Sequence, residues 1–234
     1  MTRLLLASAS PARRATLVAA GIDPLVVVSA VDEDAALAAG RERFGPLDPA
    51  DAVLLLAQAK AQAVAARLTE DDAELPGLGH DEDPEDLLVL GCDSMLELDG
   101  EILGKPADAA EAVRRWEAMR GRSGTLHTGH WLVDVRPAPV DGGSGTGAAL
   151  GATASTVVHF ADVSDEEVAA YVATDEPLAV AGAFTVDGLG GPFVEGVEGD
   201  HHAVVGLSLP LLRGLLADVG VPLPSLWRPG TRRR

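Results

Sequence analysis

The sequence predicts a mixed α/β protein built on a large sheet. Short apolar runs of Leu and Val alternate with longer segments of helical periodicity along most of the 234 residues. Apolar residues make up 47% of the chain, which is enough to bury a substantial core. Helix-capping residues and turn residues such as Asp99-Gly100 stand where the pattern changes. These three observations favour a folded α/β protein over a disordered chain.

The chain opens with a strand, a turn, a helix and a second strand. Residues 3–7 (RLLLA) have the character of a short strand, and residues 8–11 form a turn into a helix. Gly21 is suited to end this helix, because glycine adopts the left-handed conformation of a C-cap. Residues 24–30 (PLVVVSA) are predicted as the second strand. This order is typical of the start of an α/β sheet.

A long helix is predicted over residues 48–68. Asp48 and Pro49 are suited to its N-cap and first position, and no Gly or Pro follows inside the segment. At about 100° per residue, Lys60 falls on the apolar stripe of this helix. A cation there must reach an edge or face a polar cleft, where a compact ammonium suits a phosphate oxygen.

The second half of the chain continues the alternation. Asp108 with Glu111, and Ser164 with Glu167, have the spacing of helix-capping pairs. The predicted elements are a buried strand at 87–92, a hairpin at 95–103, a helix at 108–119, strands at 125–135 and 156–163, and helices at 164–173 and 207–220. They complete a large sheet with flanking helices.

Two segments without periodicity are predicted as loop insertions in one continuous domain that spans residues 1–234. Residues 70–86 are acidic, and residues 136–153 are rich in Pro and then in Gly. The basic residues 228–234 are predicted as a disordered tail. No internal repeat divides the chain.

The charge and the cysteine content limit the classes of partner. The formal net charge is -18, from 18 basic and 36 acidic residues, which argues against binding to nucleic acid. Cys92 is the only cysteine, so an internal disulfide is excluded. Neither a signal segment nor an apolar run long enough to span a bilayer is evident. We expect a cytoplasmic protein without nucleic-acid or membrane partners.

Polar residues follow three of the predicted strands. In open α/β sheets the ligand crevice lies outside the carboxyl ends of the strands. Hydroxyls and backbone N–H groups at a helix N-terminus can receive an anion, and paired carboxylates can hold a divalent cation. Taken alone, residues 8–14 look like an ordinary N-cap with surface arginines. Combined with Asp32-Glu33 and Asp93-Ser94, they predict a polyphosphate site.

Lys60 and Lys105 are the only lysines, while the other sixteen basic residues are arginines. The richness in Ala, Gly, Asp and Arg suggests a coding background that favours Arg wherever either cation serves. A lysine that persists against this background is a candidate for a specific role. Both lysines are therefore assigned to the predicted polyphosphate site.

Seven segments, in order, resemble the Maf family of nucleotide pyrophosphatases, first named as septum formation inhibitors. They are LLLASASPARRATLVAAGI, SAVDED, LAQAKAQAVA, LGCDSMLELDGEILGKP, HTGHWLVD, SDEEVAAYVAT and AGAFTVDGLGGPFVEGVEGDHHAVVGLSLPLL. The resemblance covers nearly all of the chain outside the two insertions and the tail. It implies an elongated sheet flanked by helices with a deep cleft, similar to the fold of the inosine triphosphate pyrophosphatases.

The resemblance also implies an activity and roles for individual residues. Members hydrolyse a nucleoside triphosphate between its α and β phosphates, giving a nucleoside monophosphate and pyrophosphate, with Mg²⁺ or Mn²⁺ as cofactor. Asp93, at the G-x-D position, is the implied proton acceptor that activates water. Glu33 and Asp93 are the implied metal ligands. The implied substrate-binding residues are Ser8, Ser10, Arg13, Lys60 and Lys105.

Three positions depart from the pyrimidine-specific branch of this family. Ala12, Ser94 and Asp187 stand where that branch has Arg, Thr and Gln, and these positions are expected to influence base choice. Asp187 lacks the amide donor of Gln, so a base edge that offers a donor is favoured. The preferred base stays open, and removal of non-standard nucleotides is a further expectation.

Two alternatives remain at this stage. The family's older name suggests a non-catalytic regulator of septum formation that acts by protein binding. A phosphatase that releases orthophosphate is a closer alternative, which the reaction product distinguishes. A homodimer is compatible with the sequence, which does not fix the stoichiometry.

Overall fold

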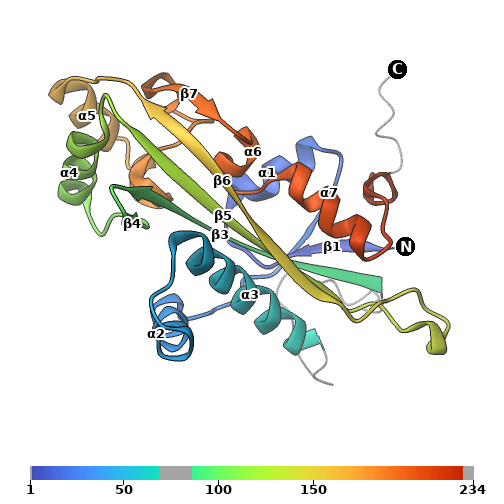
Figure 1. The fold of residues 1–234 in the computed structure, drawn as a ribbon. Coiled ribbons are helices and arrows are strands. Elements are labelled where there is room, and N and C mark those ends of the chain that lie inside the picture. Colours follow the sequence, from blue (N-terminus) through green and yellow to red (C-terminus); the bar gives the residue numbers. More distant parts are fainter. Residues whose placement is uncertain (1, 69–85, 229–234) are drawn as a thin grey trace, which may run out of the picture. The chain divides into compact units, whose positions relative to one another are not determined.

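The computed structural model describes residues 2–68 and 86–228. These residues form a mixed seven-stranded sheet flanked by helices, in the strand order β2-β1-β3-β5-β6-β7, with β4 paired to β3 (Figure 1). The strands are β1 (Arg3–Leu6), β2 (Leu25–Val26), β3 (Leu87–Leu98), β4 (Glu101–Leu103), β5 (Ser123–Asp134), β6 (Ala149–Phe160) and β7 (Val194–Glu198). The helices are α1 (Pro11–Ala19), α2 (Glu33–Phe44), α3 (Pro49–Leu68), α4 (Ala109–Met119), α5 (Asp165–Val172), α6 (His201–Val205) and α7 (Leu209–Asp218). The predicted α/β class is confirmed.

The described residues belong to two compact units. The first unit contains residues 2–68, 86–93, 129–153 and 209–228, and the second contains residues 94–128 and 154–208. The long strands β3, β5 and β6 have residues in both units. The prediction of one domain over residues 1–234 stays a prediction.

The first unit is built on parallel pairing of β1 with β2 and β3. Leu5 lies opposite Leu25 on one side and opposite Val89 on the other. Residues 4–7 and 87–92 are buried without interruption, as is typical of parallel strands covered on both faces. β1 leads into the turn before α1. β3 does not end at Cys92 as predicted but continues through Asp93 to Leu98, because its later residues pair with β4. Asp93 therefore lies within this strand.

Two glycines let α3 lie very close to the sheet. A Cβ added at Gly91 of β3 would lie 2.1 Å from the carbonyl oxygen of Ala57, and one at Gly129 of β5 would lie 2.4 Å from that of Val53. Both distances are far below van der Waals contact, so only glycine fits. The alanine-rich surface of α3 therefore meets bare backbone of the sheet, and Figure 1 shows this helix beside the long strands.

The second unit contains an aromatic core and a tight hairpin. Trp116 of α4 is fully buried and packs edge to face against Phe160, Tyr171 and Phe193, with ring centroids 5.6–5.8 Å apart. The turn between β3 and β4 has positive φ at Asp99 (54°) and Gly100 (82°), as a two-residue type I′ turn requires. The predicted hairpin is confirmed.

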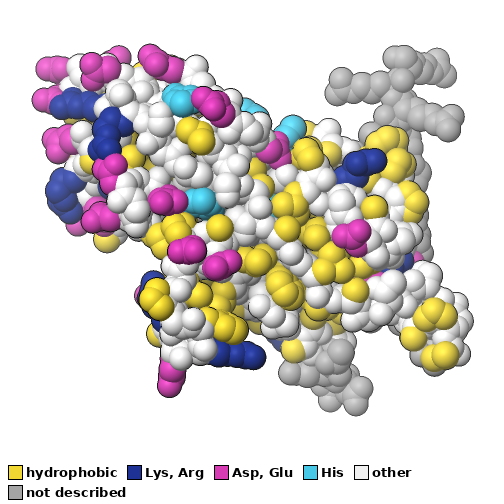
Figure 2. All heavy atoms as spheres, viewed as in Figure 1, with side chains coloured by type: hydrophobic (Ala, Val, Ile, Leu, Met, Phe, Trp, Pro, Cys, Tyr) yellow, Lys and Arg dark blue, Asp and Glu magenta, His cyan; other side chains and the backbone are white. Residues whose placement is uncertain are grey.

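Side-chain caps begin α4 and α5 of the second unit as predicted. The Asp108 carboxylate accepts from the Glu111 N–H at the start of α4. Ser164 and Glu167 form a reciprocal capping box on α5. Figure 2 shows acidic and basic side chains gathered over α4 and α5.

Two segments differ from their prediction on the N-terminal side. The strand predicted over 24–30 is reduced to β2, because Ala30 has a φ of 53° and the chain turns away from this edge of the sheet. Residues 33–44, for which no helix was predicted, form α2. Its signals were present in the sequence: Asp32 caps the N-terminus, and Gly45 (φ 84°) ends the helix. The helix is mostly exposed and lacks an apolar stripe, so the periodicity that predicts helices elsewhere in the chain is absent here.

The insertion predicted over residues 136–153 is also shorter than expected. Strand β6 begins at Ala149, because neighbouring β5 supports residues whose own composition is poor for a strand. The connection contains a 3₁₀ turn at Pro139–Asp141. The predicted acidic insertion at 70–86 and the tail at 228–234 lie outside the described residues, except for Asp86 and Arg228. Within residues 2–68 and 86–228, no helix has the length and apolarity that crossing a membrane requires.

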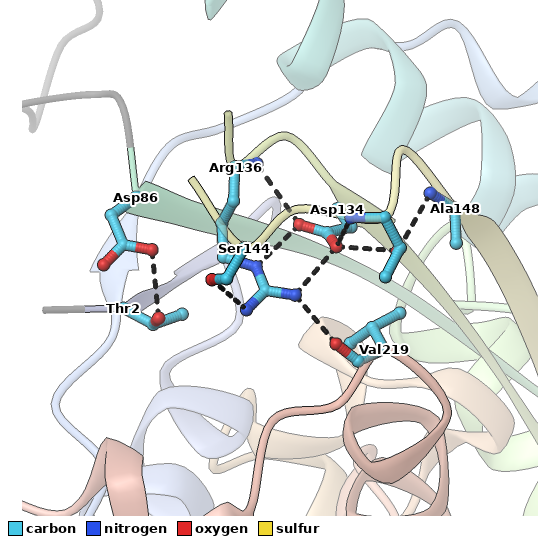
Figure 3. Close-up of polar contacts among 8 residues, drawn as sticks. Thr2, Asp86, Asp134, Arg136, Ser144, Ala148 and Val219 are labelled. Carbon is cyan, nitrogen blue, oxygen red and sulfur yellow. Dashed lines mark hydrogen bonds and ion pairs between the residues drawn. The ribbon is translucent and has the colours of Figure 1, made fainter. Parts of the chain in front are cut away.

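A buried ion pair holds the connection between β5 and β6 (Figure 3). Arg136 donates through Nε and Nη2 to the two carboxylate oxygens of Asp134, each at 2.8 Å, and also to the carbonyl of Val219. Thr146 donates to Asp134 from both its N–H and its hydroxyl, each at 2.7 Å. Burial opposes ionisation, but these donors hold the pKa of Asp134 at about 2. A bidentate, fully hydrogen-bonded pair of this kind tolerates burial.

We expect Asp134→Asn to lower the free energy of unfolding by about 3 kcal/mol at neutral pH, because Arg136 then stays buried without its counter-charge. The pKa of Asp134 is lowered in the folded state, so its contribution is present above the unfolded pKa and is lost as the pH falls. Urea unfolding should therefore show the advantage of the wild type over Asp134→Asn narrowing by about 1 kcal/mol between pH 6 and pH 3. A constant difference across this range contradicts the assignment. Asp99→Asn, which removes an exposed ion pair with Arg122, is the control with a small effect.

Candidate active site

Asp93 and Lys60 form the centre of the candidate site in the first unit. The Lys60 ammonium Nζ lies 2.6 Å from Oδ1 of Asp93 and 2.8 Å from Oε1 of Glu33. The side chains of Asp93 and Lys60 are only 10% and 12% exposed, whereas that of Glu33 is 52% exposed. One cation with little exposure is thus shared by a buried and an accessible carboxylate.

The position of Lys60 follows from the packing of α3. Ala57 and Ala61 of this helix lie against Gly91, two residues before Asp93 on β3. Because Gly91 permits this close approach, Lys60, which lies between these two alanines in the helix, reaches the carboxylate of Asp93. The apolar stripe therefore contains a cation that is satisfied at the sheet.

Glu33 reaches the same ammonium from the start of α2. Asp32 caps this helix by accepting from the N–H of Ala35 at 3.0 Å, which fixes Glu33 in the first helical turn. A carboxylate at this end of a helix is favoured by the helix dipole. The capping interaction thus positions the accessible carboxylate of the pair.

The turn between β1 and α1 lies beside β3, the strand that contains Asp93. Ser8 Oγ accepts from the N–H of Ser10 at 3.1 Å and from Nη1 of Arg13 at 3.2 Å. Arg13 Nη1 also donates to the carbonyl of Cys92 at 2.8 Å, and Ser10 caps α1 by accepting from the Arg13 N–H. Arg13 and Ser8 are buried. The structure therefore brings Ser8, Ser10, Arg13, Glu33, Lys60 and Asp93 together through one connected set of contacts.

The two neighbours of Arg13 in α1 differ from it. Ala12 is half-buried and offers no polar group. Arg14 is exposed and points to Asp23, 3.8 Å away. Of the three residues after Pro11, only Arg13 directs its guanidinium to β3, at the carbonyl of Cys92.

The electrostatic environment changes the acidity of Asp93. Burial raises the pKa of this carboxyl, and Glu33 adds to the effect, while Lys60 and Arg13 oppose it. The net direction is upward, which makes the carboxylate a stronger base than an exposed aspartate. Burial also raises the pKa of the Cys92 thiol to about 12, so this residue stays protonated and unreactive.

Ser94 begins the part of β3 that belongs to the second unit. Its hydroxyl lies 2.9 Å from Oγ1 of Thr128, and Thr128 donates to the carbonyl of Ala203 at 2.8 Å. The Thr128 proton is thereby committed, so Ser94 acts as the donor between the two hydroxyls. This orders the Ser94 hydroxyl within the second unit.

Lys105 and Asp187 also belong to the second unit. Both are exposed, and neither side chain forms an ion pair among the described residues. The backbone beside Lys105 is held by Arg115, which donates to the carbonyls of Gly104 and Lys105. The grouping of Ser94, Lys105 and Asp187 with the Asp93 centre stays a prediction.

The donor set around Lys60 fits a hard divalent cation. No cluster of three or more His, Cys, Asp or Glu side chains suited to a metal occurs in the described parts of the chain. Mg²⁺, however, is commonly held by one or two carboxylates together with water and substrate phosphates. Glu33 and Asp93 converge on one positive charge and supply such a pair. Metal coordination by them stays a prediction.

Comparison with known proteins gives a family match. The model of the family described as Maf-like protein matches residues 3–219. The chain belongs to the Maf-like protein family. The resemblance stated from seven sequence segments is confirmed.

Three relatives that match nearly all of this Maf-like chain share one name. A protein of Salinispora tropica is 56% identical over 98% of this chain and 89% of its own length. One of Streptomyces coelicolor is 52% identical over 97% of this chain and 95% of its own. One of Nocardia farcinica is 52% identical, covering 98% of both chains. All three are named nucleoside triphosphate pyrophosphatase.

We expect Gly91→Ala to destabilise this Maf-like chain by about 3 kcal/mol, because the added methyl group collides with the backbone of α3. Any folded fraction should have a displaced Lys60. Gly214→Ala is the matched control, since Gly214 lies exposed in α7 with no atom near an added Cβ. It should stabilise the protein by about 0.5–1 kcal/mol. Thermal and urea unfolding of both variants measures the contrast, and equal shifts in the two contradict the packing described for α3.

Proposed function

We propose that this Maf-like chain hydrolyses nucleoside triphosphates at the anhydride between the α and β phosphates. The products are a nucleoside monophosphate and pyrophosphate. Relatives that share about half of its residues over nearly the full chain are named for this activity. The observation that carries the proposal is the buried Asp93 carboxylate, whose pKa is raised and which touches Lys60 beside Glu33.

Asp93 is proposed as the proton acceptor. A water oxygen attacks one of the two phosphorus atoms of this anhydride, and the proton of the water passes to the Asp93 carboxylate. The bond from the attacked phosphorus to the bridging oxygen breaks, which separates the monophosphate from pyrophosphate. General-base catalysis improves as the pKa of the base approaches the working pH. The raised pKa of Asp93 supports this role, because an ordinary aspartate with a pKa near 3.9 is a weak base at neutral pH.

Cations stabilise the charge that develops on the phosphates. A divalent metal, bound by Glu33 and Asp93, would neutralise negative charge on the substrate. Lys60 stands where its ammonium can exchange a carboxylate partner for a phosphate oxygen. Arg13 orders the turn that contains Ser8 and Ser10, whose helix N-terminus is suited to an anion. Lys105 is proposed as a further phosphate-binding cation.

Base choice is proposed to depend on Ala12, Ser94 and Asp187. The Asp187 carboxylate only accepts hydrogen bonds when ionised, so it favours a base edge that donates. Removal of non-standard nucleotides from the cellular pool is the proposed role. A cytoplasmic location, a homodimer and Mg²⁺ or Mn²⁺ as the metal complete the proposal.

Asp93→Asn should lower kcat with a nucleoside triphosphate by roughly a thousandfold, because the amide cannot accept the proton of water. The measurement is pyrophosphate release, with orthophosphate scored in parallel, in the presence of Mg²⁺ or Mn²⁺. Asp99→Asn, an exposed aspartate at the end of the same strand, is the control that keeps full activity. Orthophosphate as the first product indicates a phosphatase instead, and full activity of Asp93→Asn contradicts the role of Asp93. Absence of turnover with every substrate and metal favours the non-catalytic regulator.

Glu33→Gln should raise the metal concentration needed for half-maximal activity by about tenfold or more, because a neutral amide is a weaker ligand than a carboxylate. Binding of Mn²⁺ followed by electron paramagnetic resonance gives a readout that does not depend on turnover. Asp34→Asn changes the adjacent exposed carboxylate and should leave both measurements unchanged. An unaltered Mn²⁺ affinity in Glu33→Gln removes Glu33 from the metal site.

A further inference from the structure

The carboxylate of Glu176 gathers an unusual number of donors within the second unit. Its Oε1 accepts from the Thr185 hydroxyl at 2.5 Å, the Tyr171 hydroxyl at 3.2 Å and the Gly190 N–H at 3.2 Å. Its Oε2 accepts from the Leu189 N–H at 3.1 Å. Three of the four donors belong to residues 185–190, so one half-buried side chain holds both ends of this short segment.

The segment 185–190 contains Asp187, the residue proposed above to contact the base. Asp187, Gly188 and Leu189 are exposed, whereas Phe184 and Gly190 on either side are buried. The Asp187 carboxylate makes no hydrogen bond or ion pair with any described residue and is available to a ligand. A free, exposed side chain on a segment without regular secondary structure needs an anchor if it is to recognise a base with defined geometry.

Close contact with Glu176 and Tyr171 also explains why this segment contains two glycines. A Cβ added at Gly188 would lie 2.7 Å from both carboxylate oxygens of Glu176. One added at Gly190 would lie 2.5 Å from the Tyr171 hydroxyl oxygen. The segment therefore packs directly on Glu176 and Tyr171, and side chains are excluded where it touches them.

The backbone on both sides of the anchor is also fixed. Asp175, immediately before Glu176, and Ala183 are two residues other than glycine with positive φ, at 61° and 59°. Such conformations persist only where the surroundings impose them. The carbonyl of Ala183 accepts from the indole N–H of buried Trp116 at 2.8 Å. The aromatic core thus holds the chain directly before the segment.

The charge on Glu176 is maintained by the contacts that it makes. Burial opposes ionisation, but the bonds from Thr185, Leu189 and Gly190 outweigh it and hold the pKa of Glu176 below its usual value. Charge-assisted hydrogen bonds are stronger than bonds to a neutral acceptor. Glu176 is consequently ionised at neutral pH, where its hydrogen bonds to residues 185–190 are strongest.

We propose that Glu176 is a positioning residue for base recognition, whose carboxylate fixes residues 185–190 and thereby sets the place of Asp187. The inference rests on the proposed function, since it requires that base choice depend on Asp187. Glu176 itself touches no substrate in this scheme. Gln at this position cannot replace it, because the amide N–H₂ group would face either Leu189 N–H or the three donors at Oε1.

The test compares kcat/KM for ATP, GTP, CTP, UTP and dTTP in the wild type, Glu176→Gln, Asp187→Ala and the double variant. Glu176→Gln should reduce the ratio between the best and the worst base by about tenfold, mainly through KM for the best substrate. The double variant should show no further reduction beyond Asp187→Ala, because Glu176 acts through Asp187. Gly188→Ala should reproduce the effect of Glu176→Gln from the opposite side of the contact.

Ser164→Ala is the control for stability, because it removes the N-cap of α5 in the same unit without touching residues 185–190. It should lower Tm while the base ratio stays within about twofold of the wild type. If Glu176→Gln proves unfolded by circular dichroism, Thr185→Val removes the shortest of the four bonds and takes its place.

The outcomes separate this inference from the proposed function. A wild type that releases no pyrophosphate from any of the five nucleotides overturns both. An active wild type without base preference overturns the inference alone. So does a folded Glu176→Gln with an unchanged ratio, or a double variant whose losses simply add.

Discussion

The buried contact between Lys60 and Asp93 is the interaction on which the candidate site depends. Removing two charges from water is unfavourable unless they meet with good geometry, and here the ammonium and the carboxylate oxygen are 2.6 Å apart. That distance is reached only because Gly91 leaves no side chain between α3 and β3. Arg13 donates to the carbonyl of Cys92 in the same strand, which ties the turn after β1 to β3. Backbone packing and charge placement are therefore two aspects of one arrangement.

The second unit also contains a carboxylate held by several donors, but its proposed role is different. Its task, in the scheme proposed, is to hold an exposed acceptor on a segment without regular structure. A single carboxylate, Glu176, collects hydroxyl and backbone donors, and the aromatic core around Trp116 fixes the chain before it. In the first unit a cation satisfies the carboxylate, whereas here neutral donors do. In both units glycine makes room for the contact, at Gly91 and at Gly188.

Much of the fold and part of the candidate site could be predicted from the sequence, and the predictions that failed did so for physical reasons. Helix caps and the Asp99-Gly100 turn are local signals, so α3, α4, α5 and the β3–β4 hairpin were predicted correctly. The full length of β6 was missed because a neighbouring strand overrode a weak local preference. The position of Lys60 on an apolar face indicated a polar target, but its partner Asp93 is 33 residues away and required the fold. Glu176 was missed entirely, since nothing local marks a carboxylate whose donors lie up to 14 residues further on.

The charged groups that meet at Asp93 nearly cancel one another. Two carboxylates, Glu33 and Asp93, face one ammonium and one guanidinium, so the cluster is formally neutral. It belongs to a chain of net charge -18, which repels a polyanion at long range. Encounter with such a ligand is therefore slowest in dilute buffer, and screening by added salt accelerates it. The ligand that meets the least resistance is one that arrives with its counter-ion already attached.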